Sequence, residues 1–193
     1  AAVLAEDAGP GFITGELLVG LIVRTTSSDH VWTMGRSEST DRRMEGDEAR
    51  IIGELATSLG AGAQYLRSVA ASPPADKGAY LLLLRLDAPL DRFTPDQAVL
   101  RIYVYAGNAY GSGGIGARLR RHLWRDKRLH RHIDRLTGIA DAIHAFAVPD
   151  GHECVIVAQL LATGRFDVPV PGFGSSDCRH CEAHLLRLRP RAF

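Results

Sequence analysis

The spacing of hydrophobic positions predicts seven helices and strands in the second part of the chain. Two short apolar stretches, at 79–87 and 100–106, are typical of strands, and the first is continuous enough to be buried on both faces. Apolar residues then recur at helical spacing over 115–125 and 129–139. Further along, the pattern predicts a strand, a helix closed by Gly164 and a last strand, at 142–148, 151–162 and 183–188.

This order of elements, ββααβαβ, predicts an α/β fold in which a small mixed β-sheet is flanked by helices. We expect the first two strands to pair antiparallel. The stretch 88–97 contains two prolines and is predicted to be a loop, and so is the Gly/Pro/Ser-rich stretch 165–178.

The residues before position 74 are harder to interpret. Residues 12–23 suit a strand or a short helix, and the polar stretch 25–48 is predicted to be loop or partly disordered. Residues 49–70 have apolar positions near helical spacing, although two glycines interrupt them. Two adjacent prolines then suggest a division near residue 74. We therefore expect an N-terminal extension of unassigned fold, 1–73, and a folded domain, 74–193.

Charge changes sign at the same place. The net charge of +1 combines −4 over residues 1–73 with +5 over residues 74–193. Residues 115–135 hold eight Lys and Arg residues against Asp126 and Asp134. Such clustering indicates a polyanionic partner. The predicted nucleic-acid-binding residues are Arg121, Arg125, Lys127, Arg128 and Arg131.

Composition bears on where the protein is located in the cell. No window approaches 18 uncharged apolar residues, so we expect no membrane span. We find no basic-then-apolar pattern and expect no signal peptide, and the three cysteines do not suggest a disulfide scaffold. We therefore expect a reducing, cytoplasmic location.

The segment from Tyr105 to His122 carries the clearest chemical signal. A strand leads into a glycine-rich turn and then into a helix on which Arg118 and His122, four residues apart, share a face. A guanidinium suits a phosphate because its planar fork donates two parallel hydrogen bonds. A histidine beside it could orient a water or donate to a leaving oxygen. The alternative is a solvated basic helix face.

The turn itself, Gly111-Ser-Gly-Gly-Ile-Gly116, fits the G-x-G-x-x-G pattern of dinucleotide-binding turns. That pattern also expects an acidic residue about 20 positions on, at the end of a second parallel strand. Asp134 has this spacing but lies in a predicted helix. We therefore favour glycines that permit a tight turn and let the backbone approach a phosphate.

Two groups of residues could hold metals. Glu153 lies in the first turn of a predicted helix, where the helix dipole favours a carboxylate and where it could also be the ligand of one Mg²⁺. Cys178-x-x-Cys181-x-x-His184, together with the distant Cys154, could form a Cys₃His zinc set or simply pack as free thiols. His130 and His132, two apart on a helix, face different ways and so cannot share one metal.

Several ordered blocks suggest a family. They are Gly78-Ala-Tyr80, Tyr105-Ala-Gly107, Gly113-Gly-Ile-Gly-Ala-Arg-Leu-Arg-Arg-His122, Asp126-Lys-Arg-Leu-His-Arg-His-Ile-Asp134, Glu153-Cys154 and Val170-Pro-Gly-Phe-Gly-Ser-Ser-Asp-Cys178. In these blocks the chain resembles the GIY-YIG nuclease superfamily, and specifically its compact DUF123 or Uri-type endonuclease branch, over residues 78–189. The middle isoleucines of the family's tripeptides are replaced here by Ala79 and Ala106.

The resemblance implies roles for individual residues. Tyr80 and Tyr105 would face the site from adjacent strands, and one would activate or position the attacking water. Arg118 would hold the scissile phosphate, and His122 would assist through a hydrogen bond to water or to a tyrosine. Glu153 matches the family's metal-binding glutamate by order, and His132 is a candidate for the family's accessory position. The resemblance also implies a single Mg²⁺ or Mn²⁺ ion.

Three functions are therefore open from sequence. The first is a metal-dependent endonuclease acting on DNA, with RNA not excluded, in repair or recombination. The second is a non-catalytic nucleic-acid-binding module of the same fold. The third is a zinc-stabilised domain whose basic helix serves a protein partner.

Overall fold

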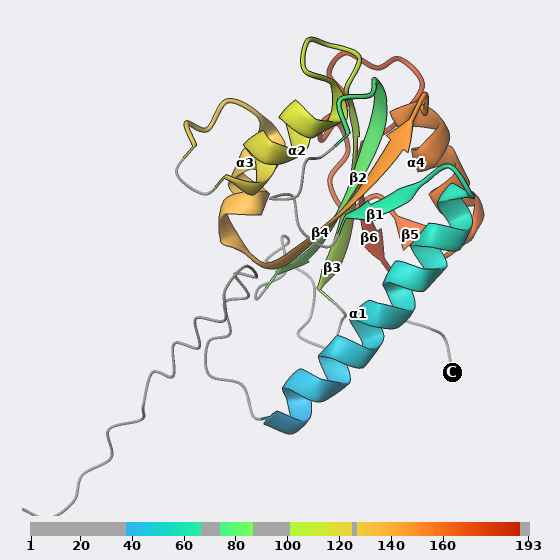
Figure 1. Ribbon diagram of the computed structural model, residues 1–193. Coiled ribbons are helices and arrows are strands. Elements are labelled where there is room, and N and C mark those ends of the chain that lie inside the picture. The colour runs from blue at the N-terminus through green and yellow to red at the C-terminus, as the bar shows by residue number, and fades with distance from the viewer. Residues whose placement is uncertain (1–37, 67–73, 87–100, 125–126, 190–193) are drawn as a thin grey trace, which may run out of the picture.

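The computed structural model describes residues 38–66, 74–86, 101–124 and 127–189, which build one sheet with helices on both faces (Figure 1). In chain order the elements are α1 (Glu38–Leu59), β1 (Gln64–Leu66), β2 (Gly78–Leu86), β3 (Ile102–Asn108), α2 (Gly114–Leu123), α3 (His132–Ile139), β4 (Ala140–Pro149), α4 (Glu153–Ala162), β5 (Phe166–Asp167) and β6 (Leu185–Leu188).

The six strands lie in the order β1-β4-β2-β3-β6-β5, and each pairing among the described residues is antiparallel. The predicted α/β class is confirmed, but the sheet is antiparallel where the sequence suggested a mixed one. All nine residues of β2 are buried, because helices cover both faces of this central strand. Its apolar run from Ala79 to Leu84 therefore reports two-sided burial and not strand direction.

The sheet separates two apolar cores. In Figure 1, α2 and α3 lie on one side of the strands, and α1 and α4 lie on the other. Leu81 and Leu83 of β2 pack in the core with α1 and α4, whereas Leu82 and Leu84 pack with α2 and α3. Because strand side chains alternate, Tyr80 shares the face of Leu82 and lies beneath α2.

Two elements from before residue 74 belong to this same architecture. Strand β1 pairs with β4, and Ile51 and Leu55 of α1 are buried in the core that also contains Phe146. The division predicted near residue 74 therefore does not separate two cores in the described residues. The apolar face of α1 needs the sheet to cover it, which is why the two parts join.

Helix α1 corrects the N-terminal prediction. The polar stretch 25–48 is predicted to be loop or partly disordered, but its residues from Glu38 onward are helical. Charged pairs one turn apart support the helix, with Arg50 donating to Asp47 and to Glu54 at 3.1 and 2.8 Å. The helix predicted over 49–70 ends at Leu59, because Gly60 adopts a left-handed φ of 82°.

The remaining elements match their predictions with shifted ends, and the first two strands of the predicted order do pair antiparallel. The loop predicted at 165–178 contains the short strand β5, which pairs with β6. The segments 12–23 and 88–97 lie outside the described residues. None of the helices that the structure describes has the length and apolar character needed to cross a membrane.

Candidate functional site

Two tyrosines on neighbouring strands form the centre of the candidate site. Tyr80 of β2 stands opposite Gly107 of β3, and Tyr105 is two residues away on the same face, so the ring centroids are 6.4 Å apart. A β-carbon at position 107 would collide with the phenol ring of Tyr80, so a glycine is required there. The exposed fractions are 2% for Tyr80 and 8% for Tyr105.

A buried chain of hydrogen bonds extends from Tyr80 into the protein. The Tyr80 hydroxyl lies 2.8 Å from Nε2 of His122, and Nδ1 of His122 lies 3.3 Å from Oδ1 of Asp134. An ionised carboxylate only accepts, so the imidazole carries its hydrogen on Nδ1 and donates to Asp134. Nε2 is then the acceptor, and the Tyr80 hydroxyl donates to it.

Asp134 anchors this chain from the start of α3. Its carboxylate is fully buried and accepts the backbone N–H groups of His130 and Arg131, both at 3.0 Å, and the guanidinium of Arg121 at 2.7 Å. Burial alone would raise the pKa of Asp134, but these donors lower it below its usual value. The sequence interpretation missed this residue as part of the site. The signal was an aspartate within a strongly basic segment.

The protonation states follow from burial. Removal from water lowers the pKa of His122 to about 4, although the nearby Asp134 carboxylate acts in the opposite direction. Burial also raises the pKa of both Tyr80 and Tyr105, while the positive charges of Arg118 and Arg131 partly oppose this. Near neutral pH, His122 is therefore an uncharged acceptor and both tyrosines keep their protons.

Arg118 and Glu153 approach the tyrosines from two different helices, and both are half-buried. The charge of Arg118 acts on both phenols, and the charge of Glu153 contributes to the raised pKa of Tyr105 after burial itself. Glu153 is the first residue of α4, where it accepts a hydrogen bond of 3.2 Å from the side-chain amide of Asn108. Both predicted residues therefore lie near the tyrosine pair.

The glycine turn before α2 has a structural purpose. The backbone N–H groups of Ile115 and Gly116, at the start of the helix, donate to the carbonyls of Asp76 and Pro74, both at 2.9 Å. A β-carbon on Gly114 would strike this same segment. The turn therefore packs against residues 74–76 of the same chain, and the N–H groups of Ile115 and Gly116 are not free to bind a phosphate.

The predicted nucleic-acid-binding residues divide into two groups. Arg121 is bonded to Asp134 and to the carbonyl of Arg128, and the ammonium of Lys127 donates to the carbonyl of His122 and to the hydroxyl of Thr137. These two cations are used inside the fold. Two others, Arg128 and Arg131, are exposed, and Arg125 lies outside the described residues.

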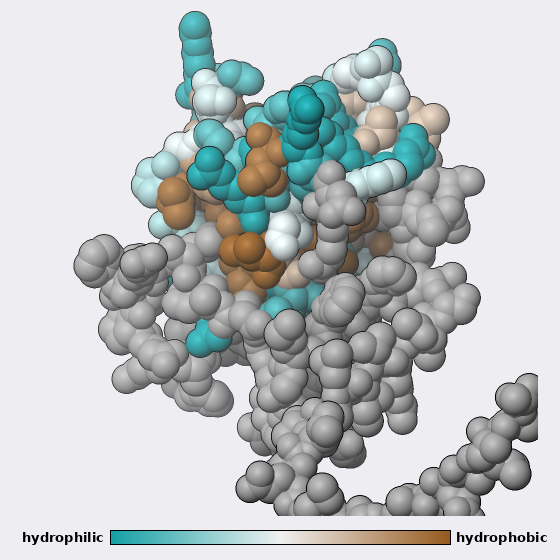
Figure 2. Space-filling view, turned by 90° about the vertical axis from the view of Figure 1, so that its left-hand side faces the viewer, coloured by the Kyte–Doolittle hydropathy of each residue, from teal (hydrophilic) through white to brown (hydrophobic). Residues whose placement is uncertain are grey.

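Exposed cations thus remain on the side of the molecule that carries α2 and α3. Figure 2 presents that side, on which hydrophilic residues (teal) gather over the upper part around a few hydrophobic ones (brown). Among the described residues of α2, α3 and the segment between them, the exposed arginines are Arg120, Arg128, Arg131 and Arg135. His132 is also exposed, and its ring lies 5.7 Å from that of Phe173, which in turn meets Tyr105 edge-on at 6.3 Å.

The structure brings the predicted Cys₃His set together next to the start of α4, where Cys154 follows Glu153. The ligand atoms of Cys154, Cys178, Cys181 and His184 all lie within 4.8 Å of one another. The backbone N–H of His180, helped by that of Cys181, lowers the pKa of the Cys178 thiol to about 6.

These features define an α/β domain with a polar site between a tyrosine-bearing antiparallel sheet and its covering helices. The chain belongs to the family described as "Domain of unknown function DUF123", whose model it matches over residues 80–192, more than half of its length. No curated protein and no solved structure matches the chain. Strand β1, helix α1 and the first residues of β2 precede the matched region.

Proposed function

We propose that the protein is a metal-dependent endonuclease that hydrolyses phosphodiester bonds in DNA. The observation that carries this proposal is the pairing of Tyr80 and Tyr105, whose rings are 6.4 Å apart on neighbouring strands, with the charge of Arg118 acting on both. Hydroxyl groups beside a guanidinium are suited to hold a water against a bound phosphate.

The Tyr80–His122–Asp134 chain supplies a path for the proton of the attacking water. Because burial raises the pKa of Tyr80, its phenol is protonated near neutral pH and no phenolate is present to act as a base. It acts instead as a relay, in which its oxygen accepts a proton from water while its own proton passes to Nε2 of His122. The imidazolium that forms is stabilised by the ionised carboxylate of Asp134. The water oxygen bonds to phosphorus, the bond to the leaving oxygen breaks, and that oxygen takes a proton from solvent.

Arg118 binds the phosphate and stabilises the charge that develops on it. Glu153 offers a half-buried carboxylate at the start of α4, and this hard oxygen donor suits a divalent cation completed by water and phosphate oxygens. When bound, Mg²⁺ or Mn²⁺ would supply Lewis-acid polarisation of the phosphate.

The test is cleavage of plasmid and branched DNA with Mg²⁺, comparing the wild type with Arg118→Ala and Tyr80→Phe. The matched control is Arg50→Ala, which removes an arginine from α1, on the opposite face of the sheet. We expect Arg118→Ala to slow cleavage by about 10²–10³-fold and Arg50→Ala to change it by less than about threefold. If the wild type and both site variants show the same trace cleavage, the enzyme proposal is wrong.

A non-catalytic nucleic-acid-binding module is the second candidate. The exposed arginines on α2, on α3 and on the segment between them favour it, because they offer phosphate contacts without using the tyrosines. This candidate expects DNA binding that weakens steeply with added salt, and no cleavage in any metal. Arg128→Ala and Arg131→Ala would then weaken binding, whereas Tyr80→Phe would leave it unchanged.

A further inference from the structure

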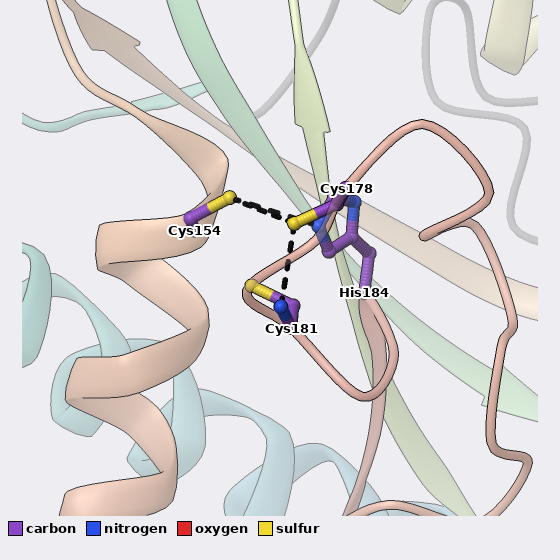
Figure 3. A group of neighbouring side chains, drawn as sticks. All are labelled: Cys154, Cys178, Cys181 and His184. Carbon is purple, nitrogen blue, oxygen red and sulfur yellow. Dashed lines mark hydrogen bonds between the residues drawn. The ribbon is translucent and has the colours of Figure 1, made fainter.

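A second cluster of reactive side chains lies apart from the tyrosine pair. Cys154 comes from the first turn of α4, whereas Cys178, Cys181 and His184 come from the loop that leads into β6. Figure 3 shows all four side chains converging on one point between the helix and the loop. The two segments that meet there are distant in the sequence, since Cys154 and Cys178 are 24 residues apart.

The spacing of these atoms is that of a tetrahedral metal site. Ligands about 2.3 Å from a zinc ion lie about 3.8 Å apart along the edges of a tetrahedron. Sγ of Cys154 is 3.4 Å from Sγ of Cys178 and 3.9 Å from Nε2 of His184. Because all four ligand atoms lie within 4.8 Å of one another, changes of up to about 1 Å in their separations would bring them to one ion.

The loop is also built to carry a thiolate. Sγ of Cys178 accepts the backbone N–H groups of His180 and Cys181, at 3.4 and 3.3 Å. These two donors orient the first sulfur of the Cys-x-x-Cys turn and balance part of its negative charge. His184 is held from its backbone, since its N–H donates to Phe173 and its carbonyl accepts from Ala106.

A disulfide explains the cluster less well. The Cys154–Cys178 separation of 3.4 Å is far from an S–S bond of about 2.05 Å. Such a bond would also leave the remaining thiol and the imidazole facing it without a purpose. Three thiolates and one imidazole are instead the donor set of a closed structural zinc site, with no position left for substrate.

We propose that Cys154, Cys178, Cys181 and His184 bind one structural zinc ion. The ion fastens the start of α4 to the loop before β6. That loop carries Phe173 and Gly174 against the ring of Tyr105, so the ion also holds this loop in place beside the tyrosine. The proposal does not depend on nuclease activity.

Metal analysis of the purified full chain is the first test. We expect about one zinc per chain in the wild type and less than about one tenth in Cys178→Ser. The matched control is His180→Ala, which removes an exposed imidazole from the same loop and should retain full zinc. A wild-type protein without zinc, with three thiols that react freely or with two joined as a disulfide, would overturn the proposal. Iron or another metal in its place would do so as well.

Cobalt substitution tests the ligand set even if Cys178→Ser fails to fold. The wild type loaded with Co²⁺ should show the visible bands of a tetrahedral site and strong sulfur-to-metal charge transfer from three thiolates. Cys154→Ser should lose about a third of the charge-transfer intensity if it binds cobalt at all. Octahedral bands, or equal charge transfer in Cys154→Ser, would contradict the assignment.

Discussion

His122 should make the stability of this fold depend on pH between 5 and 7. Its imidazole is 1% exposed, and burial is the main reason that its pKa drops to about 4. Asp134 raises this pKa, while the positive charges of Lys127 and Arg131 lower it. In the unfolded chain the same histidine titrates near ~6.5.

The sign follows from the difference between the two states. Because the pKa is lower in the folded protein, unfolding takes up a proton whenever the pH lies between the two values. The contribution of His122 to stability is therefore fully present above the unfolded pKa and is lost as the pH falls toward the folded one. Proton linkage puts the loss between pH 7 and pH 5 at about 2 kcal/mol.

The assay is urea unfolding, followed by far-UV circular dichroism, of the wild type and His122→Gln at both pH values. A glutamine can still accept from Tyr80 and donate to Asp134, but it does not titrate. We expect the variant to be less stable at pH 7 and the difference in unfolding free energy to shrink by about 2 kcal/mol at pH 5. Titrations elsewhere cancel between the two proteins. Parallel losses of stability in both proteins would refute the reasoning.

Three further changes test the packing on the two faces of the sheet. Asp134→Asn should lower the free energy of unfolding by about 3 kcal/mol in denaturant titrations, because its amide NH₂ would face groups that themselves donate. Gly107→Ala should lower it by about 1–3 kcal/mol in the same assay, because the added carbon meets the Tyr80 ring; an unchanged value would mean that the ring moves aside freely. Arg85→Leu should cost about 3 kcal/mol and Arg85→Leu with Glu48→Leu clearly less, because the single change leaves a buried carboxylate without its 2.7 Å partner.

The sequence located most of the secondary structure because periodicity reports which faces are covered. It failed at the first part of α1, because the polar pattern before residue 49 predicts a loop or partial disorder. A helix with one face on a sheet needs only a few apolar positions, here Ile51 and Leu55. The hydrophobic pattern also could not predict the direction of strand pairing. A strand covered on both faces, such as β2, is apolar whether its sheet is parallel or antiparallel.

For the candidate site, the sequence identified residue types better than their partners. The charge pattern predicts that Arg121 and Lys127 bind nucleic acid. In the structure, however, Arg121 is bonded to Asp134 and Lys127 to Thr137. A charge count cannot show this, because the partners are 13 and 10 residues away and meet only when α2 packs against α3. The same packing turns Asp134 from an isolated acid into the residue that orients His122.

Different interactions hold the two sides of the candidate site in place. Different changes should therefore weaken each side. The Tyr80 side depends on buried hydrogen bonds to Asp134, so acid and Asp134→Asn weaken it. The Glu153 side begins α4 next to Cys154, so it depends on what joins that helix to the loop before β6. A chelator that removes a structural zinc should therefore loosen α4 but leave the pKa of His122 near about 4. Lowering the pH to 5 should weaken the first side while hydrogen exchange at the start of α4 remains slow.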